Sequence, residues 1–242
     1  MSNVKKLPSA ARKPRFAGAS KTTPIDNRER KNLRVKSGKM VIVFFIGGAG
    51  DKESFYGTGP YRNIYEVQRM CEEPFNELIK SKLYHSEYLG YDEVCGRNDV
   101  KANVVQKIRN LSMPIYIIGH SLGGWNGAHL SSILTDLGYS VEMLITLDPV
   151  GAGLVKLAAD IYFSEPKPKA KFWINLRAEA KSFDASDRVA RAGSQWMVKN
   201  GPNLNYIAPI HHAEAGKKFL VRLGKQSAWD YFYSSIVRLT SP

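Results

Sequence analysis

The sequence is poor in cysteine and in long apolar runs, and each shortage excludes a class of protein. Only two cysteines, Cys71 and Cys95, occur among 242 residues, and they make no C-x-x-C pair. We therefore expect reduced thiols, with one disulfide as the alternative, and neither a zinc site nor a dithiol redox site. No apolar run approaches the roughly 18 residues that a membrane-spanning helix needs.

The N-terminal region lacks the apolar core segment of a signal peptide and has few acidic side chains. Its lysines are not followed by the apolar stretch of a Sec-type signal peptide, so we expect either a cytoplasmic protein or export by a route without such a peptide. Residues 1–39 contain 12 Lys and Arg against two acids, whereas the remainder has 23 against 20. The net charge of +13 thus belongs mostly to this end of the chain.

Residues 1–38 also contain three prolines and few large apolar side chains. Such a segment buries too little surface to offset its ordering entropy, which predicts a disordered basic arm ahead of one folded domain, residues 39–242. Four interpretations of the arm are open: a solvated tail, a targeting signal, a partner-binding segment, or a segment that binds an anionic membrane. Nucleic acid is not an expected partner, because no aromatic residues are interleaved with the basic ones and no DNA-reading motif occurs.

Strand and helix patterns alternate along the rest of the chain, which predicts an α/β fold with a mostly parallel, right-handed twisted sheet covered by helices on both faces. A short apolar segment over 154–163 is expected to be a packing helix, with a lid or membrane-facing patch as the alternative. Residues 178–210 are predicted to lack regular secondary structure. The predicted strands are 40–46, 83–90, 114–120, 141–147 and 171–177, and the predicted helices are 64–79 with a break at Pro74, 100–111, 122–137 and a C-terminal helix around 229–236.

A glycine-rich turn follows the central predicted strand. The segment Pro114–Gly124 ends in Gly-His-Ser-Leu-Gly-Gly, and a helical pattern begins at once. This is the context of a nucleophile elbow, in which a serine lies at the apex of a strained strand–helix turn. Side chains two residues before and after Ser121 would collide in so tight a turn, which explains Gly119 and Gly123. A glycine-rich turn with an incidental serine is the alternative.

A second glycine-rich loop, Gly47–Gly50, follows the first predicted strand. It is neither a dinucleotide-binding fingerprint, which needs glycine at Glu53, nor a P-loop, which needs Gly-Lys-Ser or Gly-Lys-Thr at 51–53. We therefore expect no nucleotide cofactor, and no metal site is predicted.

The elbow resembles that of the α/β-hydrolase superfamily, in particular its lipases and esterases. The resemblance extends over the fold expected for residues 40–240. The first two antiparallel strands of typical members are missing from this chain, so we expect a minimal version of the α/β-hydrolase fold. It implies that Ser121 is the nucleophile and that backbone N–H groups of Leu122 and of Gly48 or Ala49 form the oxyanion hole. It also implies a carboxylate and then a histidine, in that order along the chain.

Asp148 matches the acid-bearing turn of those lipases whose acid follows the strand after the elbow, and Pro149 is expected to hold it extended. Asp184 and Asp187 are the alternatives one strand later. Of five histidines, His120 belongs to the elbow, His129 to its helix, and His85 precedes both. The base is therefore His212 or His211, and His212 is favoured because it directly precedes Ala213, which is predicted to open the next helix.

These residues predict a serine hydrolase that cleaves carboxylic esters, in particular lipid esters, through a Ser-His-Asp triad and an acyl-enzyme. A thioesterase, amidase or acyltransferase would use the same residues. A non-catalytic binding module of the same fold is the alternative from another class, although it would not need a complete triad.

Overall fold

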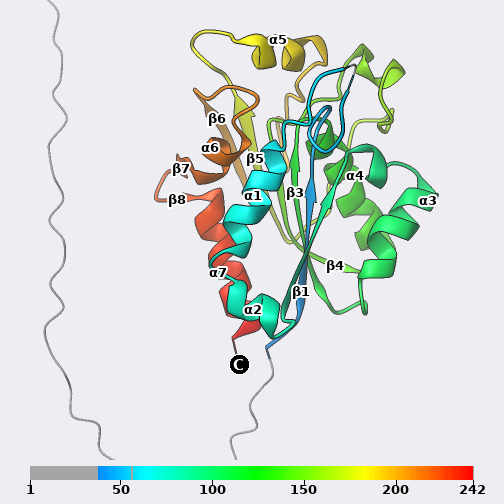
Figure 1. Ribbon diagram of the computed structural model, residues 1–242, viewed down its shortest axis with the longest axis vertical. Helices are drawn as coiled ribbons and strands as arrows, with labels where there is room; N and C mark the ends of the chain where they lie inside the picture. Colours follow the sequence, from blue (N-terminus) through cyan, green and yellow to red (C-terminus); the bar gives the residue numbers. More distant parts are fainter. Residues whose placement is uncertain (1–37, 56, 242) are drawn as a thin grey trace, which may run out of the picture. The chain divides into compact units, whose positions relative to one another are not determined.

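The computed structural model describes residues 38–55 and 57–241 (Figure 1). These residues belong to the second of the two units into which the chain divides, Lys36–Pro242. The basic arm predicted over residues 1–38 lies outside the described residues except for Gly38, so its disorder and its attraction to membranes remain predictions.

A six-stranded sheet forms the centre of the fold, with the strand order β2-β1-β3-β4-β5-β6. Every neighbouring pair is parallel, which confirms the predicted α/β class. The carboxyl ends of all six strands therefore lie at one edge of the sheet, where open α/β sheets bind their ligands. The strands are β1 Val41–Ile46, β2 Tyr84–Leu89, β3 Pro114–His120, β4 Ser140–Leu147, β5 Phe172–Ala178 and β6 Leu204–Ala208.

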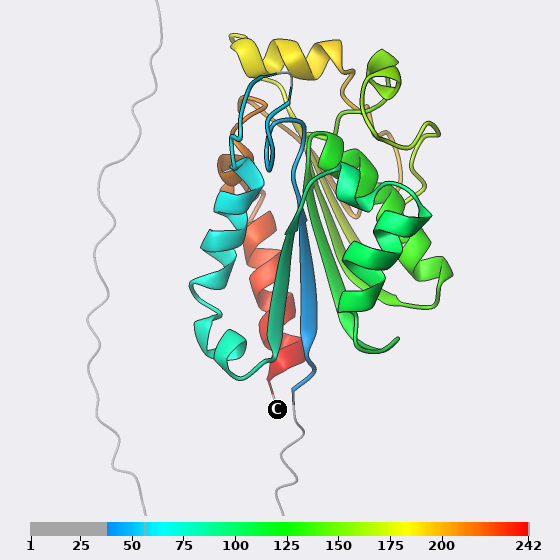
Figure 2. The same ribbon diagram turned by 45° about the vertical axis from the view of Figure 1, so that its right-hand side comes forward.

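Helices cover both faces of this sheet, as Figures 1 and 2 show. One core contains residues of α1, α6 and α7, and the other contains residues of α4 and of the helical segment after α3. The strand β1 serves both cores, because alternate side chains of a strand point to opposite faces: Ile42 and Phe44 join one core, and Val41 and Val43 join the other. The α-helices are α1 Asn63–Glu72, α2 Asn76–Lys80, α3 Arg97–Asp99, α4 Leu122–Asp136, α5 Ala185–Ala192, α6 Ala215–Leu220 and α7 Ala228–Thr240.

The predicted break near Pro74 is confirmed, since α1 and α2 are separate helices on either side of it. The helix predicted over 100–111 is irregular. It continues α3 as a π-helical turn, η3 Val100–Val104, and ends as a 3₁₀ turn, η4 Val105–Lys107. Short 3₁₀ turns also occur at η2 Asp92–Val94 and η5 Leu154–Leu157, and Arg222–Leu223 and Gln226–Ser227 pair as the hairpin β7-β8.

Two other expectations are wrong. The region predicted to be irregular contains both α5 and a sixth strand, β6, which pairs with β5. The segment 154–163 is not a packing helix: Leu154 and Leu157 are 80% and 77% exposed, and only one 3₁₀ turn forms there. A leucine side chain packed into a core would have lost nearly all of that exposure.

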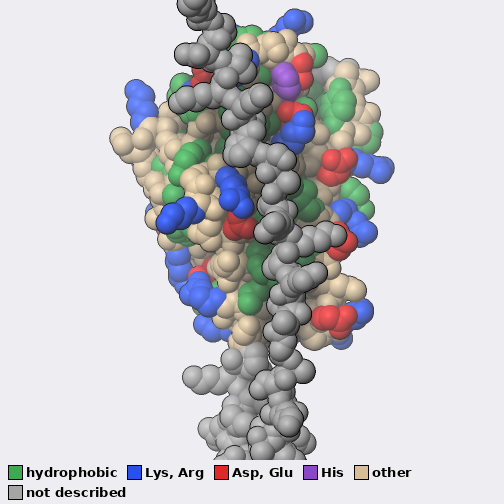
Figure 3. Space-filling model, turned by 90° about the vertical axis from the view of Figure 1, so that its left-hand side faces the viewer, with side chains coloured by type: hydrophobic (Ala, Val, Ile, Leu, Met, Phe, Trp, Pro, Cys, Tyr) green, Lys and Arg blue, Asp and Glu red, His purple; other side chains and the backbone are tan. Residues whose placement is uncertain are grey.

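Cys71 and Cys95 are both free, so the alternative of a disulfide is wrong. No helix in the described part of the chain is long and apolar enough to cross a bilayer. On the face seen in Figure 3, Lys and Arg side chains are interspersed with Asp and Glu wherever the grey residues leave it open. This mixture agrees with the small charge excess outside residues 1–39.

Candidate functional site

The turn between β3 and α4 has the strained geometry that the sequence predicted. Ser121 has φ 56° and ψ −127°, a backbone conformation that residues other than glycine rarely adopt. A Cβ atom on Gly119 would lie 2.3 Å from the carbonyl oxygen of Gly123, and one on Gly123 would lie 2.3 Å from that of Ile46. The prediction that side chains at both positions would collide is confirmed.

Ser121, His212 and Asp148 lie in one chain of hydrogen bonds at the carboxyl edge of the sheet. The Ser121 Oγ is 3.0 Å from His212 Nε2, and His212 Nδ1 is 2.6 Å from Asp148 Oδ2. All three side chains are buried. With its proton on Nδ1, a neutral His212 ring donates to Asp148 and accepts from the Ser121 hydroxyl. We call these three residues the candidate triad.

Three different strands carry the candidate triad. Ser121 follows β3, Asp148 follows β4, and His212 lies in the loop between β6 and α6. The parallel sheet thus brings residues that are far apart in the sequence to one edge. Ala213 does not open the following helix, as the sequence had suggested, because α6 begins at Ala215.

Asp148 is fixed more tightly than the sequence indicated, and in another backbone conformation. Its φ is 50°, so the expectation of an extended residue before Pro149 is wrong. Besides His212, its carboxylate accepts hydrogen bonds from the backbone N–H of Ala178 at 2.9 Å and from Gln195 Nε2 at 2.7 Å. These contacts hold a carboxylate that has no exposed surface. Sequence reasoning missed Gln195, whose segment contains no recognisable motif.

The alternative acids and the alternative base lie together, away from Ser121. The His211 Nδ1 is 2.6 Å from Asp187 Oδ2 and 3.6 Å from Asp184 Oδ2. Both aspartates also form the capping box of α5. Among the described residues, no hydrogen bond joins any of the three to Ser121. Of the hydrogen bonds in the described part of the chain, the one between Asp187 and His212 comes from the backbone N–H of His212, at 2.8 Å.

The His211–Asp187 pair has the electrostatics of an ordinary ion pair. The hydrogen bond that His211 donates to Asp187, aided by the neighbouring acids, raises the pKa of His211. Burial acts to raise the pKa of Asp187, but hydrogen bonds from His211 and from two backbone N–H groups outweigh it and lower that pKa to about 2.

Asp184, Asp187 and His211 each offer a ligand atom within 4.8 Å of the others, which is the composition of a metal site. Both carboxylates are already bonded to backbone N–H groups at the start of α5, and His211 is bonded to Asp187. The cap and the ion pair account for this cluster without an ion.

The backbone of the three predicted oxyanion residues, Leu122, Gly48 and Ala49, lies next to Ser121 or in the loop that passes against it. Leu122 is the first residue of α4, where a helix leaves N–H groups without an intrahelical acceptor. A Cβ atom on Gly48 would lie 2.6 Å from the Cβ of Ser121, so the loop backbone passes directly against the serine. Within the described part of the chain, the N–H groups of Gly48 and Ala49 have no hydrogen-bond partner.

The other histidines have separate partners. His120 is buried, and its Nε2 bonds to the carbonyl oxygen of His212 at 2.7 Å. His129 Nε2 bonds to the carbonyl oxygen of Ser164, as expected of a packed residue, and His85 pairs with Glu87 on the exposed side of β2. None of these three contacts Ser121 through a hydrogen bond among the described residues.

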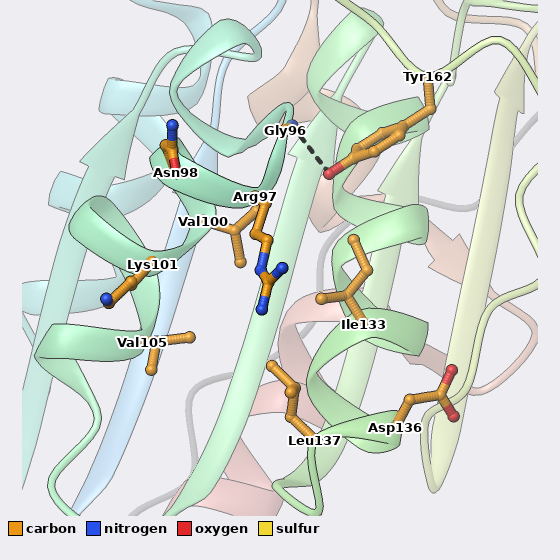
Figure 4. A pocket seen from close by; sticks show the side chains of 10 residues that line it. All are labelled: Gly96, Arg97, Asn98, Val100, Lys101, Val105, Ile133, Asp136, Leu137 and Tyr162. Carbon is orange, nitrogen blue, oxygen red and sulfur yellow. Dashed lines mark hydrogen bonds between the residues drawn. The ribbon is translucent and has the colours of Figure 1, made fainter.

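One hollow lies beside α4 and another beside the loop after β1. A cavity of about 920 Å³ lies between α4 and the segment 97–105 (Figure 4), and no residue of the candidate triad lines it. A much smaller hollow of about 90 Å³ is lined by Gly48 and Tyr91, and the Gly48 backbone passes against Ser121. We place the site at Ser121 and not at the larger cavity, because among the described serines only Ser121 is hydrogen-bonded to a histidine ring that is in turn bonded to a carboxylate.

Comparisons of the chain with models of known protein families, with curated proteins and with solved structures found no match. The function is therefore argued from the site alone.

Proposed function

We propose that this protein is a serine hydrolase that cleaves carboxylic esters at Ser121. The observation that carries the proposal is the unbroken hydrogen-bond chain from Ser121 Oγ through His212 to Asp148, with distances of 3.0 and 2.6 Å. A serine hydroxyl is a weak nucleophile until an adjacent imidazole takes its proton, and a carboxylate on the other ring nitrogen keeps the required tautomer.

The reaction begins when Ser121 Oγ attacks the ester carbonyl carbon and its proton passes to His212 Nε2. The carbonyl oxygen becomes negative and is stabilised by the N–H groups of Leu122 and of Gly48 or Ala49. The protonated His212 then gives its proton to the departing alkoxide, which leaves as the alcohol. Water attacks the acyl-enzyme in the same way, giving its proton to His212, and collapse of this second intermediate returns that proton to Ser121 and releases the acid.

Lipid esters are the substrates that we propose. The loop after β4 follows Asp148 and presents Leu154, Leu157 and Phe163 to solvent, the last with 66% exposure. Tyr91 lines both the small hollow beside Gly48 and a larger one, of about 770 Å³, that Leu157 and Phe163 also line. A short part of the substrate would fit the first hollow, and an apolar chain would extend towards the second.

The test is labelling with a fluorophosphonate, which reacts with an activated serine. The protein should be labelled, and Ser121→Ala should abolish labelling and lower ester turnover by about 10⁶-fold. Ser132→Ala is the matched control, because Ser132 lies in the same helix outside the elbow. Labelling that survives in Ser121→Ala would refute the proposal.

A panel of p-nitrophenyl esters of rising acyl length, with and without lipid vesicles, tests the substrate class separately. Turnover should rise with acyl length and with vesicles. Equal turnover of acetyl and octanoyl esters under both conditions would leave an esterase without a lipid preference.

A further inference from the structure

A lysine lies buried beneath the two adjacent histidines. Lys218, in α6, has no exposed surface, although its neighbour Lys217 is open to solvent. The Lys218 Nζ donates hydrogen bonds to the carbonyl oxygens of His211, at 3.0 Å, and of His212. Among the described residues, no carboxylate lies within 4.0 Å of this ammonium group, whereas buried charges are usually paired.

The backbone of His212 is held from several sides. Its carbonyl oxygen accepts a second hydrogen bond, from His120 Nε2, and the two imidazole rings lie 4.8 Å apart. Its N–H donates to Asp187. With one backbone group bonded to Asp187 and the other to both Lys218 and His120, the residue has little freedom to move. The ring that contacts Ser121 is therefore placed by buried groups behind it.

Burial in this arrangement lowers the pKa of both Lys218 and His120. Burial lowers the pKa of Lys218 to about 8, and the surrounding acids oppose that shift. Burial, together with the Lys218 ammonium, holds the pKa of His120 well below its usual range. At neutral pH Lys218 is thus mostly charged, and its hydrogen bonds to the two carbonyl oxygens are charge-assisted. The titratable side chains near Lys218 are Asp148, Asp184, Asp187, Glu214, His120, His211 and His212.

We propose that Lys218 is a positioning residue, whose ammonium group holds the carbonyl oxygens of His211 and His212 and so keeps the His212 ring within reach of Ser121. The inference rests on the proposed function of Ser121. A role in stability alone explains the site less well, because an apolar side chain of similar volume in place of a buried charge often leaves stability unchanged or improves it. Fixing the backbone of His212 would explain why a charged group is buried at Lys218.

Lys218→Met is the main variant, because methionine keeps much of the side-chain volume and removes the charge and the donors. A misplacement of about 1 Å in a catalytic group can cost about 100-fold in rate. We expect kcat on a soluble short-chain ester to fall by about that factor, with KM unchanged, and fluorophosphonate labelling to slow in parallel. Lys217→Met is the matched control, since it removes the same charge one residue away and should behave as wild type.

The pH profile of the wild-type protein gives a second test that does not depend on how Lys218→Met folds. As Lys218 loses its proton, its hydrogen bonds weaken, so the labelling rate should fall above about pH 8. Lys218→Arg keeps its charge throughout this range, and its labelling rate should not fall there. A flat wild-type profile between pH 7 and 9.5, or an identical decline in Lys218→Arg, would overturn the inference.

A third measurement separates this inference from the proposed function, because it needs no reaction. The proton between His212 Nδ1 and Asp148 should give a low-field NMR resonance that moves or broadens in Lys218→Met but not in Lys217→Met. If wild type is labelled at Ser121 while a folded Lys218→Met keeps wild-type kcat and resonance, the inference is wrong and the function stands. If Ser121 is not labelled but the resonance responds, the function fails and the positioning role remains.

Discussion

His211 and His212 are neighbours in the sequence, and each places its Nδ1 2.6 Å from an aspartate oxygen. The two pairs nevertheless differ in what surrounds them. The His211 side chain is 34% exposed and bonds to the capping residues of α5, whereas that of His212 is buried between Asp148 and Ser121. A histidine–aspartate distance therefore does not identify a general base. The distinguishing features are the third partner on the other ring nitrogen and the exclusion of water.

The largest expected difference between the pairs comes from removing each ring. His212→Ala should lower kcat by about 10⁶-fold, because Ser121 then has no proton acceptor. His211→Ala should stay within about tenfold of wild type, since it leaves Ser121, His212 and Asp148 in place. Initial rates on a soluble ester decide between them, and a greater loss in His211→Ala would reverse the assignment of the base.

The aspartates give the next comparison. Asp148→Asn should depress kcat by about 10³–10⁴-fold, because the amide can stabilise the wrong imidazole tautomer. Asp187→Asn removes a helix cap and a charge and should cost about 1 kcal/mol of the free energy of unfolding, with a modest effect on kcat. Urea unfolding and ester kinetics measured on the same two proteins would separate these effects. Equal losses of kcat would mean that the pairs are not functionally distinct.

The smallest effect is the pH dependence of the His211–Asp187 pair. Asp187 has a pKa lowered to about 2, so its stabilising contribution is complete above about pH 4 and is lost as the pH falls towards 2. The pKa of His211 is raised, so its contribution is complete below about pH 6.5 and is lost as the pH rises through the raised value. Urea unfolding should show His211→Gln to be less stable than wild type at pH 5.5 and no different at pH 9. A difference that grew towards pH 9 would contradict this account.

The parts of the site whose structure depends on neighbouring residues in the sequence could be predicted from the sequence. The elbow is one such part, because its strand, its glycines and the start of its helix lie within eleven consecutive residues and the steric need for glycine is local. Asp148 could be placed at a strand end, but not in its left-handed conformation, since that depends on bonds to Ala178 and Gln195 from other segments.

Features that depend on tertiary packing escaped prediction. The strand β6 is at the edge of the sheet and half-exposed, so Leu204–Ala208 lacks the apolar run that marks the central strands. The Lys217–Lys218 pair reads as a solvated stretch of helix, and only the fold shows that Lys218 turns inward. The sequence favoured His212 over His211, but for a wrong reason, because the course of the loop before α6 is specified by no local pattern.

The close packing of Gly119, Gly123 and Gly48 has a consequence for how the molecule opens. These contacts join the elbow to β1 and to the loop after it, so none of them can separate without disrupting the central strands. The hydrogen-bonded amide hydrogens of β1 and β3 should exchange with solvent only through global unfolding, whereas those of the mostly exposed residues 154–158 should exchange through small local openings. Heat should therefore abolish the reactivity of Ser121 only at the temperature at which the sheet itself melts.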